Sequence, residues 1–188
     1  NKTLVFGGWK QEAYIKAANN DAGDAFGGNP SIISIDGDTL AVGAWGEDSN
    51  QTTITNGTSA DSDDSTSGSG AVYIYKRSGS TWAQEAYIKA ANNDLDDKFG
   101  IVVSIQGDTL AVGVPYEDSN QTTITNGTSA SSDNSNASSG AVYVYKRSGS
   151  TWAQEAYIKA ANNDVWDLFG SSVSIEGDTL AAVSYTHL

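Results

Sequence analysis

Short runs of alternating apolar and polar residues, bounded by glycine-containing turns, recur along the chain and predict β-strands. Two such runs, at 101–105 and 108–114, flank a tight turn in which Gly107 can take a positive φ, so they predict a hairpin. Two longer runs follow at 140–147 and 151–160, separated by a turn of serine and glycine. The pattern therefore predicts four short antiparallel strands in this part of the chain.

The fourth run, 151–160, is open to a second interpretation. As a strand it has one half-polar face, which suits an outer edge strand. As a helix it would place Trp152, Ala156 and Tyr157 on one side, with good helix formers between them. The turn that leads directly into the run and the strands predicted around it favour the strand.

The same pattern is repeated with a period of about 70 residues. The sequence STWAQEAYIKAANND occupies 80–94 and 150–164, and a close variant occupies 7–21. Residues 70–94 and 140–164 differ only at Ile74, where the second copy has Val144. Repetition at a fixed period indicates stacked units, each too small to bury its own apolar faces.

The repeat divides the chain into units and linkers. We expect a remnant of a preceding unit at 1–25, complete units at 26–98 and 99–168, the start of a truncated unit at 169–182, and a tail at 183–188. Each complete unit contains a Ser/Thr/Asn-rich stretch without apolar periodicity, at 49–69 and at 119–139. We expect both stretches to be irregular surface loops, because they contain too little apolar area to offset the entropic cost of ordering them.

The strands of one unit differ in size in a way that predicts the overall fold. Residues of the second strand are small, those of the fourth are larger and more polar, and the third is apolar on both faces, so a unit is shaped like a wedge. Wedges arranged around an axis form a propeller. We expect an all-β fold, an incomplete β-propeller of four-stranded antiparallel blades and a fragment of a larger ring, whose open faces would be completed by missing blades of the same parent chain.

Each unit begins with a Phe-Gly pair, and its second strand ends in a Gly-Ala-Trp or Gly-Val-Pro triplet. The pairs are Phe26-Gly27, Phe99-Gly100 and Phe169-Gly170. On these residues the chain resembles the FG-GAP repeat, the blade unit of integrin-like propellers and of many bacterial surface proteins. In such a blade the ring fills the gap to the neighbouring blade and the glycine lets backbones approach. We therefore expect Phe99 and Phe169 to be buried.

The resemblance also raises the question of calcium. Integrin-type blades often carry a calcium loop between their first and second strands, but here that connection is too short to surround an ion with six to eight oxygens. A different set of aspartates recurs in pairs three residues apart. Its members are Asp21, Asp24, Asp94, Asp97, Asp164 and Asp167. Two interpretations remain open for this set, namely Ca²⁺ ligands and Asx-turns that cap polar loops; no cofactor is certain.

Composition narrows the range of functions. A net charge of −13 and a pI near 4.1 oppose binding to nucleic acid. The chain has no cysteine and a single histidine, so the usual Ser/His/Asp and Cys/His nucleophiles are missing. It also has no apolar run long enough to cross a membrane as a helix. These features predict that the chain is not an enzyme and has no membrane span.

A binding rim is expected where the second strand of each unit ends. Glu47-Asp48 and Glu117-Asp118 follow that strand, and Tyr116 precedes the second pair. Paired acids of a glycosidase are one interpretation, but adjacent side chains point apart, which favours an exposed polar rim.

We expect this rim to bind a protein or glycan, in a non-catalytic adhesion propeller located outside the cell or on a bacterial surface. The alternative is a carbohydrate-binding propeller, or the non-catalytic part of a polysaccharide-active enzyme. In that case Trp45, Tyr116 and Trp166 would stack on sugar rings.

The last appearance of the repeated GDTLAVG sequence breaks off after Ala181. The residues that follow, Val183–Leu188, resemble the translation of a sequencing adapter. We expect this stretch, which contains His187, to be an adapter scar that contributes to neither fold nor function.

Overall fold

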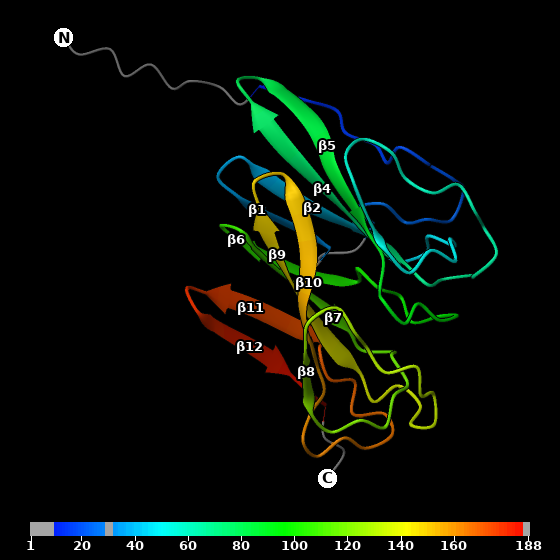
Figure 1. Cartoon of the computed structure of the whole chain (residues 1–188). Helices are drawn as coiled ribbons and strands as arrows, with labels where there is room; N and C mark the ends of the chain where they lie inside the picture. The colour runs from blue at the N-terminus through cyan, green and yellow to red at the C-terminus, as the bar shows by residue number, and fades with distance from the viewer. Residues whose placement is uncertain (1–9, 29–31, 186–188) are drawn as a thin grey trace.

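All regular structure in the described part of the chain is β-strand (Figure 1). A computed structural model describes residues 10–28 and 32–185. The expectations for residues 1–9 and for His187 fall outside this part of the chain. The described residues form two five-stranded antiparallel sheets and one two-stranded hairpin, which confirms the all-β prediction. They include no helix that is long and apolar enough to cross a membrane.

The two sheets have the same order of strands. The first sheet has the order β1-β2-β4-β5-β3, with β1 (Ile33–Asp36), β2 (Thr39–Ala44), β3 (Ile54–Asn56), β4 (Ala71–Ser78) and β5 (Thr81–Ile88). The second sheet has the order β6-β7-β9-β10-β8, with β6 (Val102–Gln106), β7 (Thr109–Val114), β8 (Ile124–Asn126), β9 (Ala141–Ser148) and β10 (Thr151–Ile158). The C-terminal hairpin consists of β11 (Ser172–Glu176) and β12 (Thr179–Val183).

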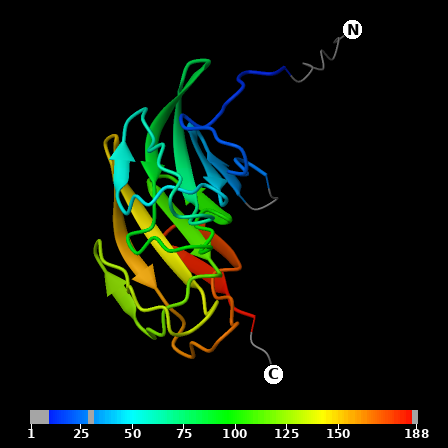
Figure 2. The ribbon, with the colours of Figure 1, turned by 90° about the vertical axis from the view of Figure 1, so that its right-hand side faces the viewer.

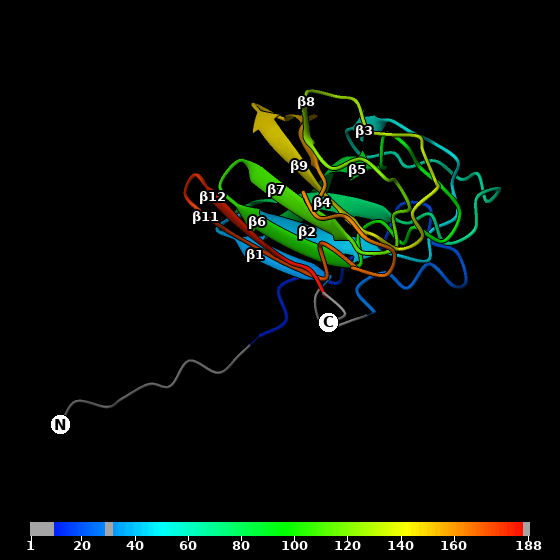
Figure 3. The same cartoon turned by 90° about the horizontal axis from the view of Figure 1, so that it is seen from below.

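The sheets stack in chain order, as propeller blades do (Figure 2). Seen from below, β1, β6 and β11 lie side by side at one edge of the stack, and the long loops gather on the side away from them (Figure 3). Backbone-to-side-chain bonds join these inner strands: Ile105 N donates to Ser34 Oγ at 3.1 Å, and Ile175 N donates to Ser104 Oγ at 3.3 Å. One serine position in each inner strand therefore holds the next sheet in register.

The sequence QEAYIKA forms a strand in the second and third of its copies, as expected. Both β5 and β10 pair along their length with the tyrosine-rich strand before them, and both have a bulge at a glutamate. The first copy, at 11–17, forms no ladder. None of the described residues pairs with this segment as β4 pairs with β5 and β9 pairs with β10.

The prediction of wholly irregular linkers was wrong in one respect. A three-residue strand lies in each linker, β3 in the first and β8 in the second, and pairs with the outer strand of its sheet. The Ile-Thr pair favours an extended backbone, and the outer strand offers a free edge for it. Each blade therefore has five strands, where the sequence predicted four. The remainder of each linker is irregular.

The predicted role of the Phe-Gly pairs holds fully at Phe99. Its ring is completely buried and meets Tyr143 and Tyr145 edge-on, with centroids 5.4 and 6.1 Å away. Phe169 is only half-buried, contrary to expectation. The tyrosines that cover Phe99 come from β9, and the described part of the C-terminal hairpin has no corresponding strand.

Candidate functional site

The turns after β2 and β7, the two linkers and the connections between sheets lie at the same end of the strands, along one side of the stack (Figure 1). We call this end the loop end. It contains all of the predicted rim residues and all of the recurrent aspartates. Its geometry decides which of these side chains are available to a ligand.

Glu47 and Glu117 were predicted to lie on an exposed rim, and this was wrong. Glu47 is 2% exposed and Glu117 is 1% exposed. Glu47 Oε2 lies 2.6 Å from Lys89 Nζ, and Glu117 Oε2 lies 2.6 Å from Lys159 Nζ. Each blade thus encloses one ion pair at its loop end.

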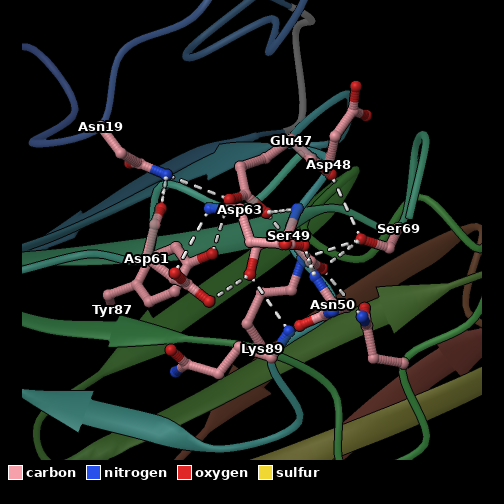
Figure 4. A network of polar contacts seen from close by, with 12 residues as sticks. Asn19, Glu47, Asp48, Ser49, Asn50, Asp61, Asp63, Ser69, Tyr87 and Lys89 are labelled. Carbon is pink, nitrogen blue, oxygen red and sulfur yellow. Dashed lines mark hydrogen bonds and ion pairs between the residues drawn. The ribbon is translucent and has the colours of Figure 1, made fainter. Parts of the chain in front are cut away.

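Further polar groups complete the network around Glu47 (Figure 4). The Tyr87 hydroxyl donates to Glu47 Oε1 at 2.6 Å, and Asn19 Nδ2 donates to the same oxygen at 3.0 Å. Lys89 Nζ also donates to Ser69 Oγ at 2.8 Å. The second blade repeats the arrangement with Tyr157, Asn92, Lys159 and Ser139.

Burial dominates the electrostatics of these networks. It lowers the pKa of Lys89 and of Lys159, although the glutamate partner of each lysine opposes the shift. Burial also raises the pKa of Tyr87 and of Tyr157. Both oxygens of the buried glutamate accept hydrogen bonds from within the chain. The glutamate therefore connects the linker to the sheet, and neither of its oxygens is available to a ligand.

One signal in the sequence could have located this network. It is the alternation of side chains between the two faces of the chain at the end of β5 and β10. Tyr87 and Lys89 are two residues apart, so in extended chain they point to the same face. An apolar ring and a lysine on one buried face require an anion opposite them.

Asp48 and Asp118, also predicted for the rim, are half-buried and hold the linkers closed. Asp48 Oδ1 accepts a hydrogen bond from Gly68 N at 2.6 Å, and Asp118 Oδ1 accepts one from Ser138 N at 2.6 Å. Of the predicted rim residues, this leaves Tyr116 as a half-exposed side chain available at the loop end.

The recurrent aspartates form local turns. Asp21 N donates to Asp24 Oδ2 at 3.0 Å, and Asp164 N donates to Asp167 Oδ2 at 3.0 Å. In each of the three pairs the second aspartate is buried. Within residues 10–28 and 32–185, no three His, Asp or Glu side chains are grouped so that they would hold a metal ion. In an Asx-turn a carboxylate accepts from the N–H two residues later, whereas here it accepts from the N–H three residues earlier, so neither interpretation of this set is confirmed.

Asp97 has the most perturbed carboxyl in the acidic loops. Burial, reinforced by Glu117, Asp94 and Asp118, raises its pKa to about 8. The same carboxyl ionises near 3.8 in the absence of these effects. Between these two values the folded chain holds a proton that the unfolded chain has lost, so stability falls as the pH rises through this range.

We expect Asp97→Asn to raise the melting temperature more at pH 9 than at pH 5. At pH 5 the folded wild type already carries a neutral side chain here, whereas at pH 9 it buries a charge among other carboxylates. Thermal melts across this range measure the difference. The exposed Asp178→Asn change serves as the control and should show no such trend. An equal effect of Asp97→Asn at both pH values would contradict the assignment.

The two blades are nearly identical, and their differences are concentrated at the loop end. Residues 32–98 align with 102–168 without a gap. Apart from exchanges between aliphatic residues, Asp36/Gln106 is the only difference outside the loop end. The others are Trp45/Pro115, Gly46/Tyr116, Asp61/Ser131, Asp64/Asn134, Thr66/Asn136, Ser67/Ala137, Gly68/Ser138, Asp96/Trp166 and Lys98/Leu168.

Several of the differing residues meet where the first blade adjoins the second. Lys98 Nζ lies 5.5 Å from the ring centroid of Trp45 and 4.7 Å from that of Tyr116. Asp96 N donates to Ser67 O at 2.9 Å. These five residues, which we call the junction surface, are Trp45, Ser67, Asp96, Lys98 and Tyr116. The junction surface joins two half-exposed aromatic rings, one cation and one exposed carboxylate, drawn from both blades.

The junction surface has a counterpart beside the C-terminal hairpin. There Trp166 takes the position of Asp96, and its N donates to Ala137 O at 3.0 Å. Its side chain is 55% exposed, and its neighbour Val165 is 47% exposed. The same backbone frame thus presents different side chains at successive junctions.

Comparison with known proteins agrees with this architecture. The family model for the FG-GAP repeat matches residues 9–75 and 82–130. A search of curated proteins finds no match. The family match spans more than half of the chain and coincides with the Phe-Gly pairs packed between sheets and with the repeated five-stranded blades. The chain therefore belongs to the FG-GAP repeat family of β-propeller proteins.

Proposed function

We propose that this chain is a non-catalytic binding module of an extracellular or cell-surface protein, and that the junction surface contacts the ligand. The observation that carries the proposal is the placement of the differences between the blades. Two copies with nearly the same strands, core and buried ion pair differ in chemical character almost only at the loop end. Different side chains on a common frame are what a binding surface requires, because a rigid scaffold can then present a specific pattern.

A protein ligand suits the chemistry of this surface best. Tyrosine and tryptophan are enriched at the centres of protein interfaces, and the junction surface contains one of each. The acidic loops around Lys98 would favour a partner with a basic patch, because complementary charge speeds and orients association. The buried glutamates take no part in binding, since their oxygens are already satisfied.

A glycan ligand is the second candidate, and the exposed ring of Trp166 favours it. A half-exposed indole provides a flat apolar face on which a sugar ring can stack. This candidate places binding at the hairpin side of the second blade, apart from the junction surface.

We expect the immobilised chain to bind at least one extracellular-matrix protein in a panel of collagen, fibronectin and laminin. Trp45→Ala/Tyr116→Ala should weaken that binding about tenfold or more, because aromatic anchors dominate interface energetics. Asp96→Lys, a change at an exposed residue, should alter the salt dependence.

The control is Ile124→Ala, a change at another exposed apolar residue, on β8. It should leave binding unchanged. A glycan array probed with wild type and Trp166→Ala tests the second candidate. Binding to neither panel, or binding that all of these variants retain, would refute the proposal.

A further inference from the structure

Three side chains of the second blade face the first blade along the boundary between the two. Tyr143, Tyr145 and Arg147 alternate along β9, so they point to the same face of its sheet. The Tyr143 hydroxyl donates to Asn92 Oδ1, and Arg147 forms an ion pair with Glu85 at 3.2 Å. Tyr145 lies between these two contacts in the sequence of the strand, and its hydroxyl has no hydrogen-bond partner among the described residues.

The unpaired hydroxyl of Tyr145 is unusual because the residue is completely buried. A buried polar group without a partner costs free energy, and most such groups are therefore paired. Burial also raises the pKa of Tyr145, so its hydroxyl keeps its proton at neutral pH and can donate it to an acceptor. The counterpart in the first blade, Tyr75, donates to Lys16 O at 2.9 Å. The same side chain is thus paired in one blade and unpaired in the other.

A cavity of about 370 Å³ lies between the two blades, and Tyr145 is part of its lining. The first blade contributes Ile54 of β3, and the second contributes Trp152 and Gln154 of β10. Both blades at this boundary have all five of their strands. A water molecule takes up about 30 Å³, so the cavity is large enough for a small organic molecule.

Contacts between the blades hold the wall of this cavity in place. Asn56 Oδ1 accepts a hydrogen bond from Trp152 N at 2.8 Å, and Asn56 Nδ2 donates to Trp152 O at 3.4 Å. The indole of Trp152 donates from Nε1 to Glu85 Oε2 at 3.0 Å. The cavity is therefore formed before any ligand arrives, as small-molecule sites usually are.

The lining combines apolar side chains with neutral hydrogen-bonding groups. Gln154 Nε2 donates to Gly127 O and Ser129 O, which leaves the carbonyl oxygen of this side chain as an acceptor. Hydroxyl groups, which can both donate and accept, come from three exposed residues of the two linkers. These are Thr52, Thr53 and Thr128.

The charge around the cavity favours a neutral ligand. None of the described residues that line it is an aspartate or a glutamate, although the chain has a net charge of −13. The lining contains one cation, Lys89, which is already paired with Glu47 at 2.6 Å. A cationic ligand would therefore find no counterion, and an anionic one would have to approach an acidic protein.

We propose that this cavity binds a neutral pyranose sugar, the terminal unit of a glycan. One sugar hydroxyl accepts a hydrogen bond from Tyr145, and another donates to Gln154. The carbon atoms of the ring pack against Ile54 and Ala91. A sugar suits this lining because its hydroxyls both donate and accept, and because it carries no charge. The site lies apart from the junction surface and from Trp166, so it is independent of both candidates for the main binding function.

The probes are the methyl glycosides of glucose, galactose and mannose, titrated into the full chain in a calorimeter. We expect at least one of them to bind with a dissociation constant in the millimolar range. Tyr145→Phe should weaken this binding about fivefold, because one neutral hydrogen bond is lost. Thr53→Trp, at an exposed residue of the lining, should abolish it by filling the cavity.

The matched controls are the corresponding changes in the other blade, Tyr75→Phe and Thr123→Trp. Neither should change the affinity for the glycoside, and Trp166→Ala should not change it either. Failure of all three glycosides to bind, or equal binding by the Tyr145→Phe variant, would overturn the proposal. Tighter binding of glucosamine or glucuronic acid than of the neutral sugars would contradict the neutral ligand.

Thermal melts without sugar separate a binding role of the hydroxyl from a structural one. Tyr145→Phe should not lower the melting temperature, because the hydroxyl that it removes makes no hydrogen bond. Tyr75→Phe should lower it, because the bond to Lys16 O is lost. An equal fall for both variants would show that the Tyr145 hydroxyl already has a partner in the free chain, which contradicts the proposal.

Discussion

Replacement of Gly113 by alanine is expected to destabilise the chain by about 3 kcal/mol or more, because it forces two blades apart. Gly113 is the last residue but one of the buried strand β7, and a Cβ there would overlap the carbonyl oxygen of Gly170 in the next repeat. A backbone carbonyl cannot rotate away as a flexible side chain would. The clash can be relieved only by separating the strand from its neighbour.

Urea denaturation of the wild type and the variant measures this cost. Gly149→Ala is the matched control, because Gly149 has a φ of +65° but faces open space. The control should lose only about 1 kcal/mol, the conformational penalty of a positive φ. Equal losses for the two variants would show that close approach between blades does not limit stability.

Lys159→Met is expected to cost about 3–5 kcal/mol, because it leaves Glu117 buried without its counterion. The lysine and the glutamate are both almost fully buried and lie 2.6 Å apart. Adding Glu117→Gln should recover part of this loss. A neutral amide oxygen still accepts hydrogen bonds from Tyr157 and Asn92 but requires no compensating charge.

The control for this series is Lys146→Met. Lys146 is exposed and donates to Thr109 Oγ1 at 2.7 Å, and no carboxylate among residues 10–28 and 32–185 pairs with it. Its loss should change the free energy of unfolding by less than about 0.5 kcal/mol. If Lys159→Met proved as mild, or if the double variant were no more stable than Lys159→Met, the ion pair would not be the element that closes the linker.

The sequence predicted those features of the fold that depend on period and alternation. The strands β6, β7, β9 and β10 follow their apolar patterns, and the buried ring of Phe99 follows from its place at a blade junction. These features rest on local pattern or on repetition, which a single sequence displays.

Features that depend on contacts between distant residues were predicted poorly. Glu47 stands in a polar loop and looks exposed, but its partner Lys89 reaches it from the end of another strand. The strand β3 is only three residues long and forms because β5 has a free edge beside it. The junction surface likewise required the structure, since Trp45, Lys98 and Tyr116 belong to three different segments.

In two places a glutamate of one repeat contacts an arginine and a tryptophan of the next repeat. Glu12 contacts Arg77 and Trp82, and Glu85 contacts Arg147 and Trp152. These inter-sheet glutamate contacts have a consequence for how such a protein changes length in evolution. Each complete blade carries both halves of the contact, a glutamate for the repeat that follows and an Arg-Trp pair for the one before. A tandem duplication of one period therefore supplies every new boundary with matched partners, and no compensating substitution is needed. The near identity of 70–94 and 140–164 is the expected mark of such an event. Gain or loss of exactly one period by recombination thus leaves the interfaces between the remaining blades with matched partners.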